Sequence, residues 1–315
     1  MAEDPMSTPD AAVPAGWART RERGTFALMR LMFFVMPHLA RPVVVYIVHA
    51  IALYFFVFGR RARAASLDYL TRVAKALPES DIRPTWRVAY RHFRAFGTSI
   101  LDKLDTWSGR LSVDDVVFED YATMRAVAHA PRGALVLGSH LGNLEALRAL
   151  GTRGRRVKLN VLVHTQHADY FNRILQKAGA TDVELIQVTT LDPAKAIELR
   201  QRIDRGEWVV ITADRVPVHG GRTVDVNFLG GSAPLPIGPY VMASVLECPV
   251  YTLFVLRRGA RNHVHFEPFA ERVTWQRPSR DAVIADCAQK YAERLEHYLR
   301  LEPLQWFNFY RFWRN

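Results

Sequence analysis

The sequence predicts an α/β fold with a mostly parallel central sheet flanked by helices. After residue 110, short apolar segments alternate with helical ones, which is typical of parallel strands joined by crossover helices. The chain has 315 residues, of which 49% are hydrophobic and 23% charged, close to the averages for globular proteins. In sheets of this type, ligands bind at the carboxyl ends of the strands, where functional side chains are therefore expected.

The elements follow from apolar periodicity and from the turn residues between them. The predicted strands cover residues 134–137, 157–163, 183–188, 208–212, 224–228 and 250–257, with 263–267 as an antiparallel edge strand. The predicted helices in this part cover residues 144–150, 168–178, 193–205, 237–246 and about 280–300. One α/β domain, 65–315, accounts for all of them.

The N-terminal part differs in composition from this domain. Residues 1–16 are rich in Pro, Ala and small polar residues, and we expect a disordered leader. Residues 17–64 combine apolar stretches with arginines, and we expect helices that contact a membrane. Residues 65–107 are expected to be helical with a break near 78–84, and His92 and Arg94 are expected at solvated or surface positions.

The second apolar stretch, 42–59, has no formally charged residue. As a helix it would be about 27 Å long, slightly shorter than the roughly 30 Å hydrocarbon core of a bilayer. Arg41 precedes it and Arg60, Arg61 and Arg63 follow it, so the positive-inside rule gives no orientation. It could be a buried core helix or part of a hairpin that enters one leaflet while its arginines meet lipid phosphates. The alternation of apolar stretches and arginines favours membrane contact.

Charge and cysteine content restrict the partners and the chemistry. Lys and Arg outnumber Asp and Glu by 42 to 31, and the net charge of +11 favours an anionic partner. A membrane surface ranks before an acidic carrier protein, and nucleic acid ranks last because no nucleic-acid-binding motif is present. The two cysteines, Cys248 and Cys287, have no metal-ligand spacing, so we expect ordinary buried thiols and a site without a metal.

The most informative segment follows the first strand of the α/β part. The strand ends at Gly138, a turn carries Ser139 and His140, Asn143 can cap the next helix, and Glu145 falls in its first turn. A histidine held by a carboxylate at one ring nitrogen can take a proton at the other, as the activation of an alcohol requires. His140 could instead be a structural loop histidine and Glu145 a favourable helix charge. The combined pattern favours the pair as general base and partner.

Further polar residues are expected at the same sheet edge. Asp214 and Arg215 follow the strand 208–212 and should lie near His140, where they orient an acceptor head group or form a structural ion pair. Arg222 is a candidate phosphate contact or an ordinary loop charge. His164 ends another strand and is more typical of a capping or core histidine.

At these residues the chain resembles a known superfamily. His140 and Glu145 have the spacing of the H-x4-D/E signature of glycerolipid and lysophospholipid acyltransferases. More closely, the chain resembles the branch that contains the bacterial late lipid A (lauroyl and myristoyl) acyltransferases. The basic apolar N-terminal region, the Ala213-Asp-Arg215 turn followed by Asn227-Phe-Leu-Gly-Gly231, and the aromatic ending 303–313 support that branch. The resemblance covers roughly residues 20–313.

The resemblance implies a glycerolipid acyltransferase-like fold and transfer of an acyl group from an acyl carrier protein or coenzyme A thioester to a hydroxyl of a lipid or glycolipid. It implies no cofactor besides this co-substrate, and a place at the cytoplasmic face of the bacterial inner membrane. The catalytic candidates are His140 and Glu145. The substrate-binding candidates are Ser139, Asn143, His164, Asp214, Arg215 and Arg222.

Two alternatives stay open. One is a membrane-associated lipid esterase or thioesterase that uses the same His140 and Glu145 to activate water. The other is a non-catalytic binder of anionic lipid or nucleic acid. The Asp214–Arg215 pair also differs from the polar pair more common in lipid A enzymes, which leaves the acceptor open.

Overall fold

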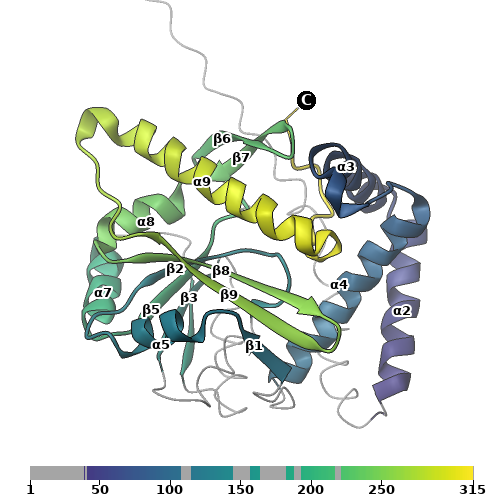
Figure 1. Ribbon diagram of the computed structural model, residues 1–315, viewed down its shortest axis with the longest axis horizontal. Coiled ribbons are helices and arrows are strands. Elements are labelled where there is room, and N and C mark those ends of the chain that lie inside the picture. Colours follow the sequence, from purple (N-terminus) through teal and green to yellow (C-terminus); the bar gives the residue numbers. More distant parts are fainter. Residues whose placement is uncertain are drawn as a thin grey trace, which may run out of the picture.

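The structure is a computed structural model that describes residues 39, 41–107, 115–144, 157–163, 182–187, 193–216 and 221–314. It confirms the α/β prediction: seven strands form one sheet in the order β1-β9-β8-β2-β5-β3-β4, with helices on both faces (Figure 1). Its strands are β1 Val116–Phe118, β2 Leu135–Gly138, β3 Leu159–Val163, β4 Val183–Gln187, β5 Trp208–Thr212, β8 Val250–Arg258 and β9 Arg261–Ala270. A separate hairpin consists of β6 Thr223–Phe228 and β7 Gly231–Pro236.

The pairing in the sheet is parallel except between β8 and β9. The antiparallel pairing of β9 is confirmed, but its predicted edge position is wrong. The three-residue strand β1 adds to β9 in parallel and forms the edge instead. A strand this short gives almost no periodic signal, which is why the sequence did not predict it.

Side chains that alternate along the strands build two cores. On β5, Val209 and Ile211 face the core formed with α7 Pro193–Asp204, α8 Gly238–Leu246 and α9 Arg280–Leu301. Val210 faces the other core, to which Met124 of α5 Tyr121–His129 contributes. In Figure 1, α9 crosses one face of the sheet and α5 lies on the other.

The N-terminal helices form a layer at the end of the molecule opposite α7 and α8 (Figure 1). They are α2 Arg41–Phe58, α3 Arg60–Ala76 and α4 Trp86–Trp107, with a short 3-10 turn at Pro78–Ser80. Gly97 of α4 allows α2 to approach closely, since a Cβ there would lie 2.7 Å from Val48. The predicted break near 78–84 is confirmed, and the predicted boundary at residues 64/65 falls inside α3.

None of the described helices alone has the length and composition to cross a bilayer. The segments Pro42–Phe58 and Arg60–Ala76 meet that criterion only together, as a pair bent by 92°.

His92 is buried, so its predicted solvated position is wrong. Its Nδ1 lies 2.9 Å from Ser66 Oγ and its Nε2 lies 2.9 Å from the carbonyl oxygen of Trp306. A carbonyl only accepts, so Nε2 carries the proton and Nδ1 accepts from the serine hydroxyl. Burial lowers the pKa of His92 to about 4, although the hydrogen bond to Trp306 opposes this shift, and the ring is therefore neutral.

Candidate active site

The turn after β2 lies at the carboxyl edge of the sheet, between β8 and β5. Gly142 has φ +73°, and a Cβ at this position would lie 1.7 Å from the carbonyl oxygen of Val255. Glycine is therefore required here, both for the left-handed backbone and for the close approach to β8. The turn is fixed in place, and with it the side chain of His140.

The structure brings His140 and Asp214 together. Gly138 and Thr212 are paired in the parallel register of β2 and β5, and the two residues follow two positions beyond them. His140 Nδ1 lies 2.9 Å from Asp214 Oδ1, and the His140 backbone N–H donates to Asp214 Oδ2 over 2.8 Å. Since a carboxylate accepts, Nδ1 carries the proton, and the lone pair of the imidazole is on Nε2.

Asp214 is fully buried and has a third donor. The indole Nε1–H of Trp306 donates to Asp214 Oδ2 over 2.9 Å. Burial alone would raise the pKa of this carboxyl, but the His140 charge and hydrogen bonds and the nearby Arg215 outweigh it and lower the pKa to about 2. Asp214 is therefore ionised and is the hydrogen-bond acceptor for the Nδ1–H of His140.

The His140 side chain keeps 34% of its surface exposed, so its ring can be reached from solvent. Burial lowers its pKa below the ordinary value, Asp214 opposes this shift, and the positive charges of Arg215 and Lys103 add to it. The imidazole is therefore neutral near pH 7 and available as a proton acceptor.

This charge state predicts the pH dependence of a reaction that uses His140 as base. Below the pKa of His140 the ring holds a proton and cannot take another, so kcat/KM should rise with pH through that pKa. The folded-state pKa lies below the ordinary imidazole value of about 6.5, so the rise should be complete by neutral pH. A series of kcat/KM measurements from about pH 4.5 to 8.5 checks this, and a midpoint above about 6.5 would contradict it.

The backbone N–H groups of the turn are occupied, so they are not available to a developing oxyanion. Those of His140, Leu141, Gly142 and Asn143 donate to Asp214 Oδ2, Ser139 Oγ, the Gln305 carbonyl and the Val255 carbonyl respectively. Among the described residues, the positively charged side chains near His140 are candidates for that role.

Three other predicted residues lie around the turn. Ser139 is buried and its Oγ accepts from the turn. Asn143 is buried, and neither polar atom of its side chain has a partner among the described residues. Arg215 donates from Nη2 to the Phe307 carbonyl over 2.6 Å, and its guanidinium lies 5.9 Å from the Tyr310 ring centroid. Of these three, only Arg215 presents a charge near His140.

The remaining predicted residues are Arg222, His164 and Glu145. Arg222 is exposed at the start of the β6–β7 hairpin, with no hydrogen bond or ion pair of its side chain to His140. His164 and Glu145 lie outside the described residues, so their roles stay predictions. Trp306 and Lys103 were not predicted as residues near His140. Trp306 belongs to an aromatic C-terminal segment and Lys103 to an amphipathic helix, and neither pattern indicates which groups their polar atoms contact.

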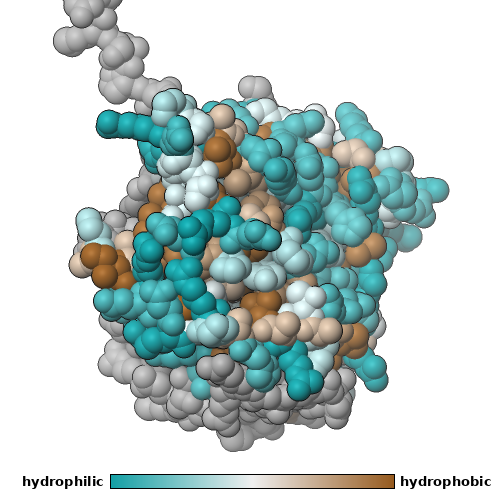
Figure 2. Space-filling model, turned by 60° about the vertical axis from the view of Figure 1, so that its left-hand side comes forward, coloured by the Kyte–Doolittle hydropathy of each residue, from teal (hydrophilic) through white to brown (hydrophobic). Residues whose placement is uncertain are grey.

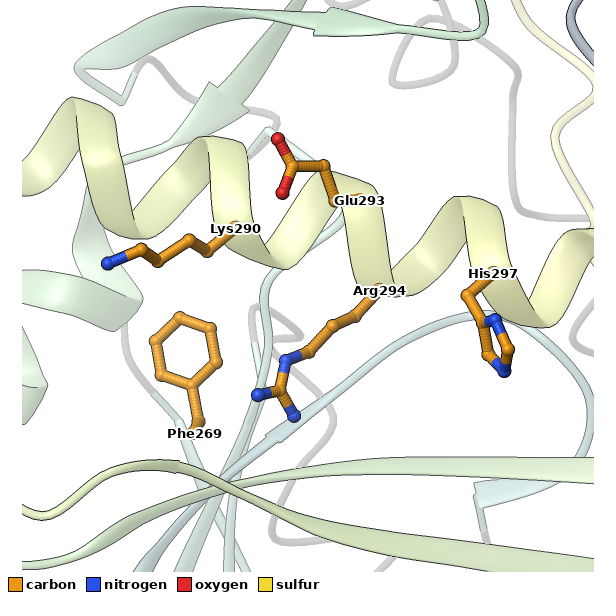
Figure 3. Close-up of a pocket in the computed structure, with 5 residues that line it drawn as sticks. All are labelled: Phe269, Lys290, Glu293, Arg294 and His297. Atoms are coloured by element: carbon orange, nitrogen blue, oxygen red, sulfur yellow. The ribbon is translucent and has the colours of Figure 1, made fainter.

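A groove between α9 and β9 lies away from this edge. Its residues in Figure 3 are Phe269, Lys290, Glu293, Arg294 and His297. Ala270, the neighbour of Phe269, pairs with Val250 of β8, which pairs with Leu135 at the start of β2. His140 follows the end of β2, so Phe269 and the imidazole lie toward opposite ends of the strands.

No three His, Cys, Asp or Glu side chains gather as a metal site within the described ranges. What the edge does hold is a neutral imidazole with an ionised, buried carboxylate behind it, an arrangement suited to general-base catalysis. Residues 18–315 match the family described as bacterial lipid A biosynthesis acyltransferase. The chain belongs to this family, as predicted. Membership supports acyltransferase activity with a lipid acceptor. No curated protein matches the chain.

Proposed function

We propose that this protein transfers a fatty acyl group from an acyl carrier protein or coenzyme A thioester to a hydroxyl of a lipid A-like lipid, with His140 as general base. The observation that carries the proposal is the Nδ1–H hydrogen bond to Asp214, which leaves Nε2 to accept a proton. The family match supports the acyl chemistry and the lipid acceptor. A general base fits transfer to oxygen, because a hydroxyl must lose its proton as it attacks.

In the proposed reaction, His140 Nε2 takes the proton of the acceptor hydroxyl while its oxygen attacks the thioester carbonyl carbon. The tetrahedral intermediate then collapses, the carbon–sulfur bond breaks, and the imidazolium returns the proton to the leaving thiolate. The products are an ester and a free thiol. Because the amides of the turn are occupied, the cation of Arg215 is the candidate for stabilising the oxyanion.

Transfer of a labelled acyl group tests the proposal directly. Purified protein is incubated with total membrane lipids and either labelled acyl carrier protein thioester or labelled acyl coenzyme A. A new labelled lipid supports the transferase, identifies the acceptor and decides between the donors. Labelled free fatty acid as the only product would support the esterase or thioesterase alternative instead.

The proposal extends to a place at the cytoplasmic face of the inner membrane, with the outward face of α2 in contact with lipid. Buried residues of α2 recur at Val44, Val48, Ala52 and Phe56, so one face packs inward. The opposite face is also apolar: Tyr46 is 77% and Phe58 70% exposed. An apolar face of this kind is typical of interfacial helices. The side shown in Figure 2 contrasts with it, because its apolar residues are scattered among hydrophilic ones.

The arginines after α2 have different roles. Arg63 Nη1 donates to the carbonyl oxygens of Phe56 and Val57, and its guanidinium lies 4.7 Å from the Trp86 ring centroid. This side chain therefore caps the C-terminus of α2. Arg60 and Arg61 are exposed and remain candidates for lipid phosphates.

A single charge on the outward face of α2 should weaken membrane binding. Phe58→Asp removes a ring whose burial in lipid contributes about 1.5–3 kcal/mol, so binding should fall by about tenfold or more. Sedimentation with vesicles containing anionic phospholipid measures this. Ile197→Asp on α7, where Ile197 is 60% exposed, is the matched control and should leave binding unchanged. Equal effects of both substitutions would argue against the α2 contact.

A further inference from the structure

Trp306 connects the sheet edge to the N-terminal helices. Its indole Nε1–H donates to Asp214 Oδ2 over 2.9 Å, and its carbonyl oxygen accepts from His92 Nε2 over 2.9 Å. Its backbone also forms an antiparallel bridge with Leu141, next to His140. The tryptophan is 1% exposed, so both of its hydrogen bonds are made away from solvent.

The orientation of Trp306 is fixed from several sides. His92 is held in turn by Ser66 on α3, and the neutral ring can serve only as donor toward the Trp306 carbonyl. The indole makes edge-to-face contacts with Tyr69, Phe228 and Phe312, with interplanar angles of 63° to 89° and ring centroids 5.0 to 5.3 Å away. Because these contacts fix the indole, its N–H points at Asp214 Oδ2.

We propose that Trp306 is a positioning residue for the general base: its indole N–H holds Asp214 so that Oδ1 faces His140 Nδ1. This inference rests on the proposed role of His140. Without Trp306, the carboxylate would be held only by the two donors of His140 itself, one to each oxygen, and the terminal torsion of aspartate is intrinsically broad. The indole adds a second donor to Oδ2 from a separate, buried segment, which holds the carboxylate independently of His140 and keeps the imidazole in the tautomer with Nε2 unprotonated.

The same hydrogen bond adjusts the basicity of the pair. A donor to Asp214 withdraws negative charge from the carboxylate, and so weakens its pull on a proton at His140. Without the donor the imidazolium would be better stabilised, and the pKa of His140 would rise. Among the described residues, charged and titratable groups from several elements interact with His140 or Asp214. They are Lys103 of α4, Arg215 after β5, Tyr240 of α8, Tyr291 of α9 and Tyr310.

Trp306→Phe tests the proposal, because it keeps an aromatic ring and removes the N–H. The kcat of acyl transfer should fall about 10- to 100-fold, the size expected for one hydrogen bond to a charged group, while KM changes little. The midpoint of the acid limb of kcat/KM should move to higher pH. A purely structural role would lower the melting temperature but would not move that midpoint.

Trp313→Phe is the matched control. Trp313 is also buried in the same aromatic cluster, with its ring centroid 6.1 Å from that of Trp306, and its Nε1–H donates over 2.9 Å to the Phe228 carbonyl. This substitution also removes one buried indole hydrogen bond, but one with no link to Asp214. It should lower the melting temperature by a similar amount and leave the pH midpoint unchanged.

An isostere separates positioning from packing if Trp306→Phe does not fold. Benzothienylalanine in place of Trp306 preserves the bicyclic shape and replaces the N–H with sulfur, and should give the same loss of kcat and shift of the midpoint. An unchanged midpoint in a folded variant would overturn the proposal. If His140→Ala itself keeps full activity, the proposed function fails instead; if His140→Ala is inactive and the Trp306 variants behave like wild type, only this inference fails.

Discussion

His140→Ala should lower the rate of acyl transfer by about 10²- to 10⁴-fold, the range that a positioned general base contributes. The loss should be in kcat, because the imidazole acts on the acceptor proton as the new bond forms and binds neither substrate strongly beforehand. Steady-state kinetics with the donor and acceptor identified by the labelling experiment give kcat and KM separately.

Two checks make this result specific. His129→Ala removes an exposed histidine on α5, which lies on the face of the sheet opposite α9. This variant should be as active as wild type. A circular dichroism spectrum and melting temperature close to those of wild type show that the His140 variant folds. Full activity of a folded His140→Ala protein would rule out the proposed mechanism.

Asp214→Asn should cause a loss of similar size, about 10²- to 10⁴-fold in kcat. The carboxylate accepts from three N–H groups, two of His140 and one of Trp306. An amide has only one accepting oxygen, so its NH₂ group must face at least one of these donors. The imidazole relieves this conflict by moving its proton to Nε2, which then can no longer act as base.

Glu145→Gln is the comparison that decides which carboxylate is the partner of His140. Asp214 holds Nδ1 in the structure, while Glu145 lies outside the described residues. If Asp214 is the partner, Glu145→Gln should cost far less in kcat than Asp214→Asn. The reverse order would restore the H-x4-E pair that the sequence motif predicted and reduce Asp214 to a structural role.

Local sequence signals predicted most of the sheet. The strand 208–212 is confirmed with the same bounds as β5; β2 is shifted by one residue at both ends, and β3, β4 and β8 differ by one or two residues at one end. These strands are continuous apolar runs between polar turns, which gives them a clear signal. The alternation also predicted that Asp214 and His140 would meet, since both follow parallel strands at the same edge.

The details of the site needed tertiary information. The in-register pairing of Gly138 with Thr212 decides that Asp214 reaches Nδ1, and no pattern within either strand encodes a register between them. Trp306 belongs to the aromatic C-terminal segment 303–313, whose sequence is equally consistent with core packing. The burial of His92 depends on Ser66 and Trp306, which lie on two other segments.

The separation of these segments along the chain has a consequence for folding. Asp214 is 74 residues from His140 and 92 from Trp306, and Trp306 is 214 residues from His92. Contacts between such distant positions require large loops to close and tend to form late. A chain that has folded its sheet but not yet docked its C-terminal segment would have the His140–Asp214 pair without the hydrogen bond from Trp306. Full activity would then require docking of the C-terminal segment as well as a folded sheet.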